Sequence, residues 1–196
     1  MNFKKLRNVY VFSCIGLCLI FLSPTLAIII PVPEGQEFSE LWILGPTHIM
    51  GDYPFNVSIG SNYHVFLGVG NQMGRLEYYL VKVKLRNQSE SMPDSSLGVP
   101  SELPATYEYQ LFLRDNSTWE TEFTFSLRDV SSKGSVGRIS TIVINGYAFS
   151  IDKVATQDET DGGFYYELFF ELWIYNATIS DFQFHNRYAG FWVRIS

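Results

Sequence analysis

The fold is decided by the stretch Tyr63-His64-Val65-Phe66-Leu67-Gly68-Val69, in which core-type residues stand at every second position. The alternating sets are Tyr63, Val65, Leu67 and Val69 on one side and His64, Phe66 and Gly68 on the other. A period of two places alternate side chains on opposite faces of an extended chain, whereas a helix needs a period of 3.6. The stretch therefore predicts a half-buried antiparallel strand.

The same alternation recurs along the rest of the chain. Strands are predicted at Phe38–Leu44, Tyr63–Val69, Leu76–Arg86, Tyr107–Leu113, Trp119–Leu127, Phe164–Tyr175 (the longest) and Phe182–Ile195, with a hairpin over Ile139–Ile151. The hairpin turns at Asn145-Gly146, a pair suited to the positive φ angles of a type I′ turn. These nine strands, without a convincing amphipathic helix after residue 32, predict an all-β, immunoglobulin-like antiparallel β-sandwich over residues 33–196.

The first 32 residues predict a membrane segment. Val9 to Ile30 is almost wholly apolar and would form a helix about 33 Å long, enough to cross a bilayer. Lys4, Lys5 and Arg7 precede it, which favours a cytoplasmic N-terminus and a domain outside the cell membrane.

A cleaved signal peptide is the alternative, with Thr25-Leu26-Ala27 as its cleavage site and a secreted domain as its result. The apolar run continues through Ile30 beyond that site, so we favour an uncleaved anchor that contacts membrane lipid.

Charge and cysteine content exclude several classes of function. The chain carries a net charge of −6, and its first 32 residues hold three cations and no acid, which leaves −9 on the domain. Phosphate backbones would repel such a domain, so nucleic acid is not an expected partner. Both cysteines, Cys14 and Cys18, fall in the apolar segment, so the domain has neither disulfides nor a thiolate metal site.

Two glycine-containing segments superficially suggest ligand sites. Gly68 to Gly74 resembles a phosphate-binding loop, but a strand follows it where such a loop needs a helix, so we expect its glycines to form a turn. Asp158 to Gly163 gathers three carboxylates, which suit calcium, yet they lack the alternate spacing of a calcium-binding loop. We interpret the second segment as an ordinary acidic turn and predict no metal or cofactor.

Catalytic groups are sparse. The histidines are His48, His64 and His185, and neither a nucleophile elbow nor an HExxH motif occurs. We therefore expect a protein that is not an enzyme, with a hydrolase whose site the sequence does not reveal as an alternative.

Four asparagines stand in N-x-S/T sequons: Asn56, Asn87, Asn116 and Asn176. Asn87, Asn116 and Asn176 lie at predicted strand ends or turns, where a glycan would not disturb the sheet. The sequons predict a glycosylated external surface.

The predicted strand at Phe164–Tyr175 carries aromatic residues on both faces. Its second face holds Tyr165, Phe169, Trp173 and Tyr175. A central strand covered by a neighbouring segment accounts for this pattern, and we favour that interpretation. The functional alternative is an exposed platform that stacks sugars or anchors a protein. The long, proline-rich connection Asn87–Ala105 is interpreted as a crossover between the two sheets.

The region after the apolar segment resembles a known family. The residues that carry the resemblance are Pro33-Glu34-Gly35-Gln36-Glu37-Phe38-Ser39-Glu40-Leu41-Trp42-Ile43-Leu44-Gly45-Pro46, Tyr53-Pro54, Gly68-Val69-Gly70-Asn71 and Tyr78 to Val83. They are similar to an uncharacterised family of archaeal membrane proteins, domain of unknown function 1616. The resemblance implies an archaeal cell surface and supplies no catalytic or ligand residues. Most members carry several membrane helices, so their membrane roles are not transferred to this chain.

These observations together predict a membrane-anchored surface module that binds another envelope component, protein or glycan. One alternative is a structural subunit of a surface assembly, with Phe38–Leu44 as a strand donated to a neighbour.

Overall fold

The computed structural model describes residues 7, 10–15, 17 and 37–195, which belong to two units, Met1–Glu37 and Phe38–Ser196. Residues 7, 10–15 and 17 are helical. Within the described residues, no helix has the length and apolar content needed to cross a membrane. Most of the predicted anchor, its cleavage site and the boundary at residue 32 lie outside the described residues.

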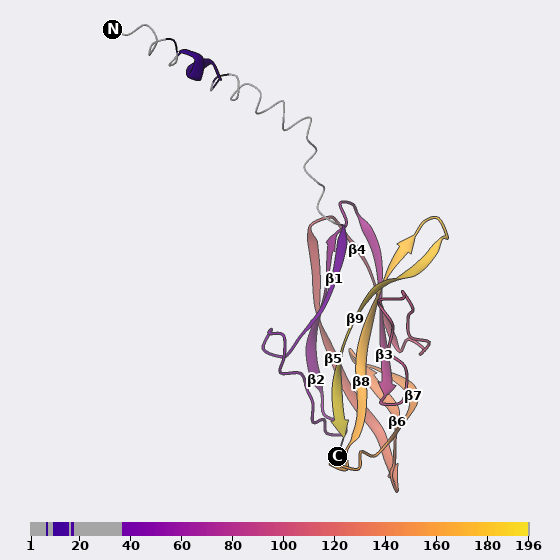
Figure 1. The fold of residues 1–196 in the computed structure, drawn as a ribbon. Coiled ribbons are helices and arrows are strands. Elements are labelled where there is room, and N and C mark those ends of the chain that lie inside the picture. The colour runs from indigo at the N-terminus through magenta and orange to yellow at the C-terminus, as the bar shows by residue number, and fades with distance from the viewer. Residues whose placement is uncertain (1–6, 8–9, 16, 18–36, 196) are drawn as a thin grey trace. The chain divides into compact units, whose positions relative to one another are not determined.

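The second unit consists of nine antiparallel strands in two sheets (Figure 1). The strands are β1 (Phe38–Leu44), β2 (Tyr63–Gln72), β3 (Glu77–Asn87), β4 (Tyr107–Leu113), β5 (Ser117–Lys133), β6 (Val136–Ile144), β7 (Tyr147–Thr156), β8 (Phe164–Asn176) and β9 (Asp181–Ile195). Their order is β1-β2-β5-β6-β7 in one sheet and β4-β3-β8-β9 in the other. The predicted all-β antiparallel sandwich is confirmed, and no helix interrupts residues 37–195.

The connectivity of the first sheet differs from that of an immunoglobulin domain. In an immunoglobulin domain, the corresponding sheet has the strand order A-B-E-D. Strand D, at the edge, therefore precedes strand E in the sequence, although E is the strand beside B. Here the chain first forms β5 beside β2 and then moves outward through β6 and β7. The consecutive hairpins β5–β6 and β6–β7 produce this order, because short turns keep successive strands adjacent.

The core lies between the sheets and follows the predicted alternation. Val65, Leu67 and Val69 of β2 are fully buried, and the odd-numbered positions of β3 face the same core. Phe123 of β5 meets Phe170 of β8 edge to face, with 5.0 Å between ring centroids. This aromatic contact joins the two sheets.

Turn chemistry is confirmed at one hairpin, and a strand length is corrected at another. Asn145 and Gly146 have φ angles of 50° and 84°, as the predicted turn between β6 and β7 requires. The longest strand is β5, with 17 residues against 13 in β8. The predicted strand ends too early, at Leu127, because the residues of β5 next to the β5–β6 turn, Ser131 to Lys133, are polar and exposed. The apolar alternation therefore ends before the strand does.

The sheet edges are partly protected. The backbone carbonyl of Ser39 on β1 accepts a hydrogen bond from Arg187 of β9 at 3.3 Å. The β6–β7 ladder is irregular between Ile139 and Thr141, and Asp152 opposite has a φ of 46°. Such a bulge twists an edge strand and hinders pairing with another chain. β1, the strand predicted as a donor, pairs with β2 of its own domain.

Two tyrosines, Tyr109 and Tyr166, should make the folded domain less stable at alkaline pH. Burial raises the pKa of Tyr109 and that of Tyr166 to about 12, above the ordinary value of 10.0. Between pH 10 and 12 the unfolded chain loses these protons while the folded domain retains them, so the stability they contribute is lost as pH rises. Denaturant unfolding at pH 9 and pH 11 should give a lower midpoint at pH 11, and Tyr109→Phe with Tyr166→Phe should reduce that difference. An unchanged pH dependence in the double variant would contradict this explanation.

Candidate binding surface on the four-stranded sheet

The four residues of the predicted platform, Tyr165, Phe169, Trp173 and Tyr175, differ in burial and position on the outer face of the β4-β3-β8-β9 sheet. Phe169 is fully buried. Tyr165 lies near the other end of β8, where its hydroxyl donates to Asp161 and its ring is near Phe55. Trp173 and Tyr175 are near neighbours on the partly exposed part of the face. The platform therefore does not exist as one surface.

A different aromatic cluster crosses the sheet, and we call it the aromatic row. It consists of Phe112, Tyr78, Tyr175 and Phe182, one from each strand of the sheet. Phe112 stacks on Tyr78 with 4.1 Å between centroids and an interplanar angle of 9°. Tyr78 also meets Phe182 at 4.8 Å and Tyr175 at 5.9 Å. Phe112 is 67% exposed and Tyr175 is 38% exposed, so the row presents ring surface to solvent.

A groove lies next to the aromatic row. Its lining residues are Leu97, Gly98, Pro100, Trp173, Phe182, Gln183, Phe184 and Asn186, and its volume is about 480 Å³. Trp173 donates its indole N–H to Glu171 at 3.1 Å, and the Lys82 ammonium lies 3.6 Å from the centroid of a Trp173 ring. These two contacts fix the indole in place at the groove wall.

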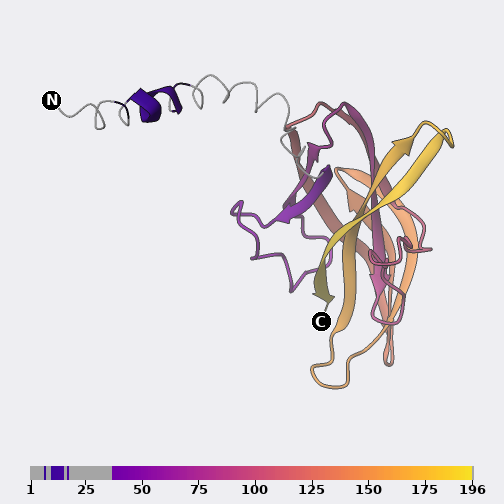
Figure 2. The ribbon, with the colours of Figure 1, turned by 45° about the horizontal axis from the view of Figure 1, so that its top comes forward.

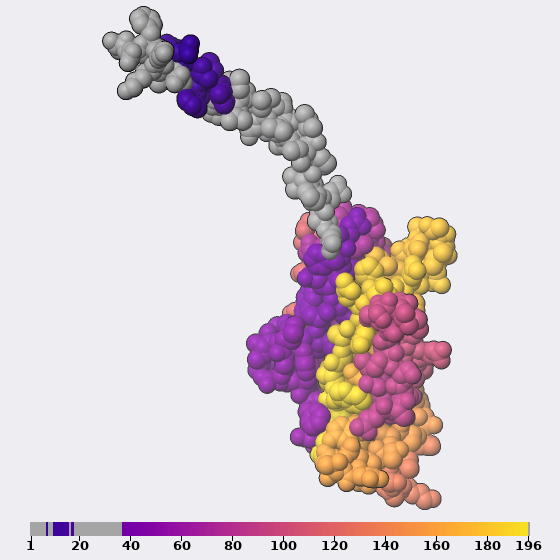
Figure 3. Space-filling view, in the orientation of Figure 1, coloured from indigo at the N-terminus to yellow at the C-terminus, as the bar shows by residue number. Residues whose placement is uncertain are grey.

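The long connection between β3 and β4 forms the other wall. It joins neighbouring strands of one sheet, so the predicted crossover is wrong. Ser101 donates its backbone N–H to Glu171 at 2.8 Å and accepts a hydrogen bond from Lys84 at 2.7 Å, which places the segment against β3 and β8. Figure 3 shows this segment in magenta beside the yellow β9. The sequence does not indicate that this loop packs on its own sheet, because the polar contacts that hold it are with Lys84 of β3 and Glu171 of β8.

Charged pairs beneath the loop are unusually buried. Lys84 and Glu171 lie 2.8 Å apart with side-chain exposures of 3% and 0%. Arg86 and Glu167 form a second pair at 2.5 Å, and the Arg86 guanidinium lies 4.7 Å from the centroid of a Trp192 ring. Removing charges from water is costly unless each has a close partner. The loop and sheet thus enclose a polar layer whose members satisfy one another.

The β8–β9 hairpin projects from the body of the sandwich (Figure 2). Its ladder is irregular after Leu172, where Trp173 pairs with Phe184 and Leu172 with Arg187. Within this irregularity lies His185, whose pKa is lowered by burial and by the nearby Arg187 charge. His185 is therefore partly withdrawn from water.

The other two histidines lie on the outer face of the five-stranded sheet. His48 stacks on Phe66 with 3.5 Å between centroids and contacts Glu120 at 3.2 Å. His64 meets the edge of the Phe66 ring. His48 is more than half exposed. The geometry brings one histidine to one carboxylate at the protein surface.

Gly68 and Gly70 lie within β2 and not in a turn, which corrects the sequence prediction, and Gly74 alone of the three forms the turn, with a φ of 70°. The Trp42 indole covers Gly68 so closely that a Cβ atom there would overlap it. The indole N–H then reaches Glu120 at 3.1 Å. This glycine is needed for close approach of a side chain, not for phosphate binding.

Two of the three carboxylates of the acidic turn, Asp158 and Asp161, have protein partners. Asp158 accepts the backbone N–H of Thr160 at 2.8 Å. Asp161 accepts from the Tyr165 hydroxyl and from Arg194, the latter at 3.0 Å, and these contacts lower the pKa of Asp161. No group of three potential metal ligands was found among residues 7, 10–15, 17 and 37–195.

The four sequon asparagines occupy different settings. Asn56 and Asn116 are exposed. Asn176 begins the β8–β9 turn, and its amide donates to Gln183 at 3.1 Å. Asn87 donates to the Val154 carbonyl at 2.7 Å and accepts from nearby backbone, so a glycan would compete with an existing contact. Glycosylation stays a prediction at all four.

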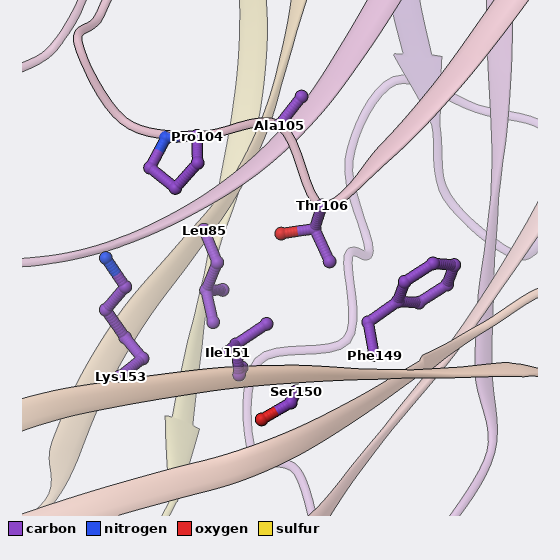
Figure 4. Close-up of a pocket in the computed structure, with 8 residues that line it drawn as sticks. All are labelled: Leu85, Pro104, Ala105, Thr106, Phe149, Ser150, Ile151 and Lys153. Atoms are coloured by element: carbon purple, nitrogen blue, oxygen red, sulfur yellow. The ribbon is translucent and has the colours of Figure 1, made fainter.

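A second cavity of about 230 Å³ lies beside the edge strand β7 (Figure 4). Leu85, Phe149 and Ile151 are among the apolar residues that line it. Lys153 lines it too, but its ammonium is paired with Glu90 at 2.8 Å. The cavity therefore has a wall of mixed polarity, and its lysine is already paired.

Comparison with known proteins places the chain in a family. The family model "Domain of unknown function (DUF1616)" matches residues 32–150, from before β1 into β7. No curated protein matches. The match confirms the resemblance to domain of unknown function 1616 and extends it well beyond residues 33–86.

Similar solved structures share only a loose likeness. A β-glucosidase from Listeria innocua in complex with glucose has 10% identity and a TM-score of 0.39 over 82% of this chain, and the match spans 16% of the enzyme. AggA, the major subunit of aggregative adherence fimbriae type I from Escherichia coli, has 10% identity and a TM-score of 0.24, covering 83% of this chain and 95% of AggA. Neither similarity bears on activity. The family match covers more than half of the sequence, and the chain belongs to the family Domain of unknown function (DUF1616).

Proposed function

We propose that this protein is a non-enzymatic surface module, held at the cell membrane by residues 9–30, that binds another envelope component in the groove beside Trp173. The observation that carries the proposal is the groove itself, where an indole held on two sides meets the projecting hairpin. A binding site needs ring surface that is already ordered, because ordering side chains on binding costs free energy.

The chemistry of the groove suits a hydroxyl-rich or peptide-like ligand. Trp173, Phe182 and Phe184 supply ring surface, while Gln183 and Asn186 carry amides that both donate and accept hydrogen bonds. None of its eight lining residues is charged, so a neutral ligand fits better than a strongly charged one. A glycan or a protein segment of the envelope meets this description.

The external location is supported by the sequence. The apolar length of Val9–Ile30 and the cations before it favour an anchor with the domain outside. The absence of cysteine from the domain is compatible with export, because the sandwich has a large core of its own.

Affinity capture from native membranes with the full anchored chain tests the proposal. Trp173→Ala should weaken capture roughly 30-fold, the effect of losing a tryptophan hot spot worth about 2 kcal/mol. Trp42→Ala is the matched control, since Trp42 lies on the other sheet. Equal capture by both variants, or no specific capture by the unmodified chain, would refute the groove as the binding site.

A further inference from the structure

We propose that the end of the sandwich where β1 begins rests on the lipid bilayer surface, with the aromatic row near the headgroups. The inference rests on the anchor in the proposed function and names a second contact of the same module, whose surface adjoins the groove at Phe182. It concerns five side chains whose exposure the fold leaves unexplained: Phe38, Leu76, Phe112, Tyr175 and Ile179.

Strand register places these side chains at one end. Phe38 pairs with Gln72, so β1 starts beside the turn that joins β2 and β3. Asn71 pairs with Ser117, which brings the β4–β5 turn to the same end. The β8–β9 turn follows Asn176, only two residues beyond Ile174, the partner of Tyr79 near the start of β3. The C-terminal end of β9 lies at the opposite end of the sandwich (Figure 1).

The exposed side chains at this end are large and apolar. Leu76 in the β2–β3 turn is 60% exposed, Ile179 in the β8–β9 turn is 58% exposed, and Phe38 is 43% exposed. The aromatic row lies just inside these turns and includes two tyrosines. Amphipathic rings beside apolar side chains are typical of protein surfaces at a membrane–water interface.

The length of the tether keeps this end close to the membrane. Only eight peptide units separate Ile30, the last residue of the predicted span, from Phe38. Fully extended, they reach at most about 28 Å. The opposite end of the sandwich has no such constraint, so a lipid surface is the partner that the covalent structure brings to these side chains.

Charge does not make this end a site for anionic lipid. The turns at residues 73–76, 114–116 and 177–180 contain Arg75, Arg114 and Asp115, and the adjoining strand ends add Glu77 and Asp181, so these five residues carry a net charge of −1. Arg75 is paired with Glu77 at 2.6 Å. The proposed contact is therefore apolar and does not depend on anionic headgroups.

The experiment uses the full chain with Cys14→Ser and Cys18→Ser, reconstituted in bilayers that contain headgroup-spin-labelled phosphatidylcholine. One reporter is a fluorophore on Ala177→Cys in the β8–β9 turn, and the matched control is Ser135→Cys in the β5–β6 turn at the far end; both positions are exposed. We expect the lipid label to quench the Ala177→Cys reporter several-fold more than the control. Adding Leu76→Ser, Phe112→Ser and Ile179→Ser, which spare the groove, should bring quenching down to the control level.

Four results would overturn the inference. Equal quenching at both reporters would show that the end does not approach lipid. Quenching that survives the triple substitution would show that the tether alone causes it. Energy transfer between Ala177→Cys reporters on neighbouring chains, without lipid quenching, would assign the surface to a second copy. A chain that does not float with the bilayers would refute the anchor and the lipid contact together, whereas loss of lipid contact with capture intact would leave the groove proposal standing.

Discussion

Glu171→Ala is expected to lower the free energy of unfolding by about 3–5 kcal/mol, the usual cost of removing one partner from a buried ion pair. Glu171 is fully buried and lies 2.8 Å from Lys84, which is itself only 3% exposed. In the variant the Lys84 ammonium keeps its hydrogen bond to the Ser101 carbonyl but loses its counter-charge. The substitution also removes the acceptors of the Ser101 and Trp173 N–H groups, so the loop and the groove wall should loosen.

The matched control removes both charges. Lys84→Met with Glu171→Leu keeps apolar volume in the layer and should recover most of the loss, because replacing a buried pair by apolar residues is often close to neutral. Urea unfolding gives the free energies, and hydrogen exchange at Ser101 reports the loop. A double variant as unstable as Glu171→Ala would contradict the explanation and show that packing, not the uncompensated charge, determines the effect.

Phe123→Ala is expected to cost about 3–5 kcal/mol, because it removes a fully buried ring and leaves a cavity between the two sheets. Phe123 contacts both Phe125 of its own strand and Phe170 of the opposite sheet. The surrounding strands are fixed by their ladders, so they cannot close the cavity fully.

A double-mutant cycle with Phe170→Ala separates the ring–ring contact from simple loss of volume. We expect a coupling energy of about 0.5–1.5 kcal/mol, the range for aromatic pairs. Phe112→Ala serves as the surface control and should change stability by less than about 0.5 kcal/mol, apart from its contact with Tyr78. Equal losses for Phe112→Ala and Phe123→Ala would mean that the sandwich core has been misassigned.

Much of the fold was predictable from local sequence. Period-two alternation indicates an extended strand when one face packs on the core, as in β4, where Leu111 and Leu113 are buried and Gln110 and Phe112 are exposed. Asn145-Gly146 identified a hairpin because few residue pairs accept two positive φ angles. The order of β5, β6 and β7 was not predictable, because alternation says which face is buried and not which strand lies next to which.

The binding surface was harder to predict. Trp173 and Tyr175 were recognised because they alternate within one strand, whereas Phe112 and Phe182 join them only through the register of β4 and β9. Phe169 was grouped with them because it shares their face, yet the same face is covered further along the strand. Contacts between distant strands decide such cases, and no periodicity within a segment encodes them.

The segment over residues 88–105 has a consequence for anyone who would trim or graft this domain. Loops of this length are usually the first candidates for deletion in protein engineering, since most lie on the surface and tolerate change. Here the segment around Ser101 covers Lys84 and Glu171 and excludes water from this ion pair. A shortened domain with a tight turn between β3 and β4 would remove the backbone partners of Lys84 and Glu171 and expose this ion pair to water. The length of the loop is therefore a structural requirement of the domain.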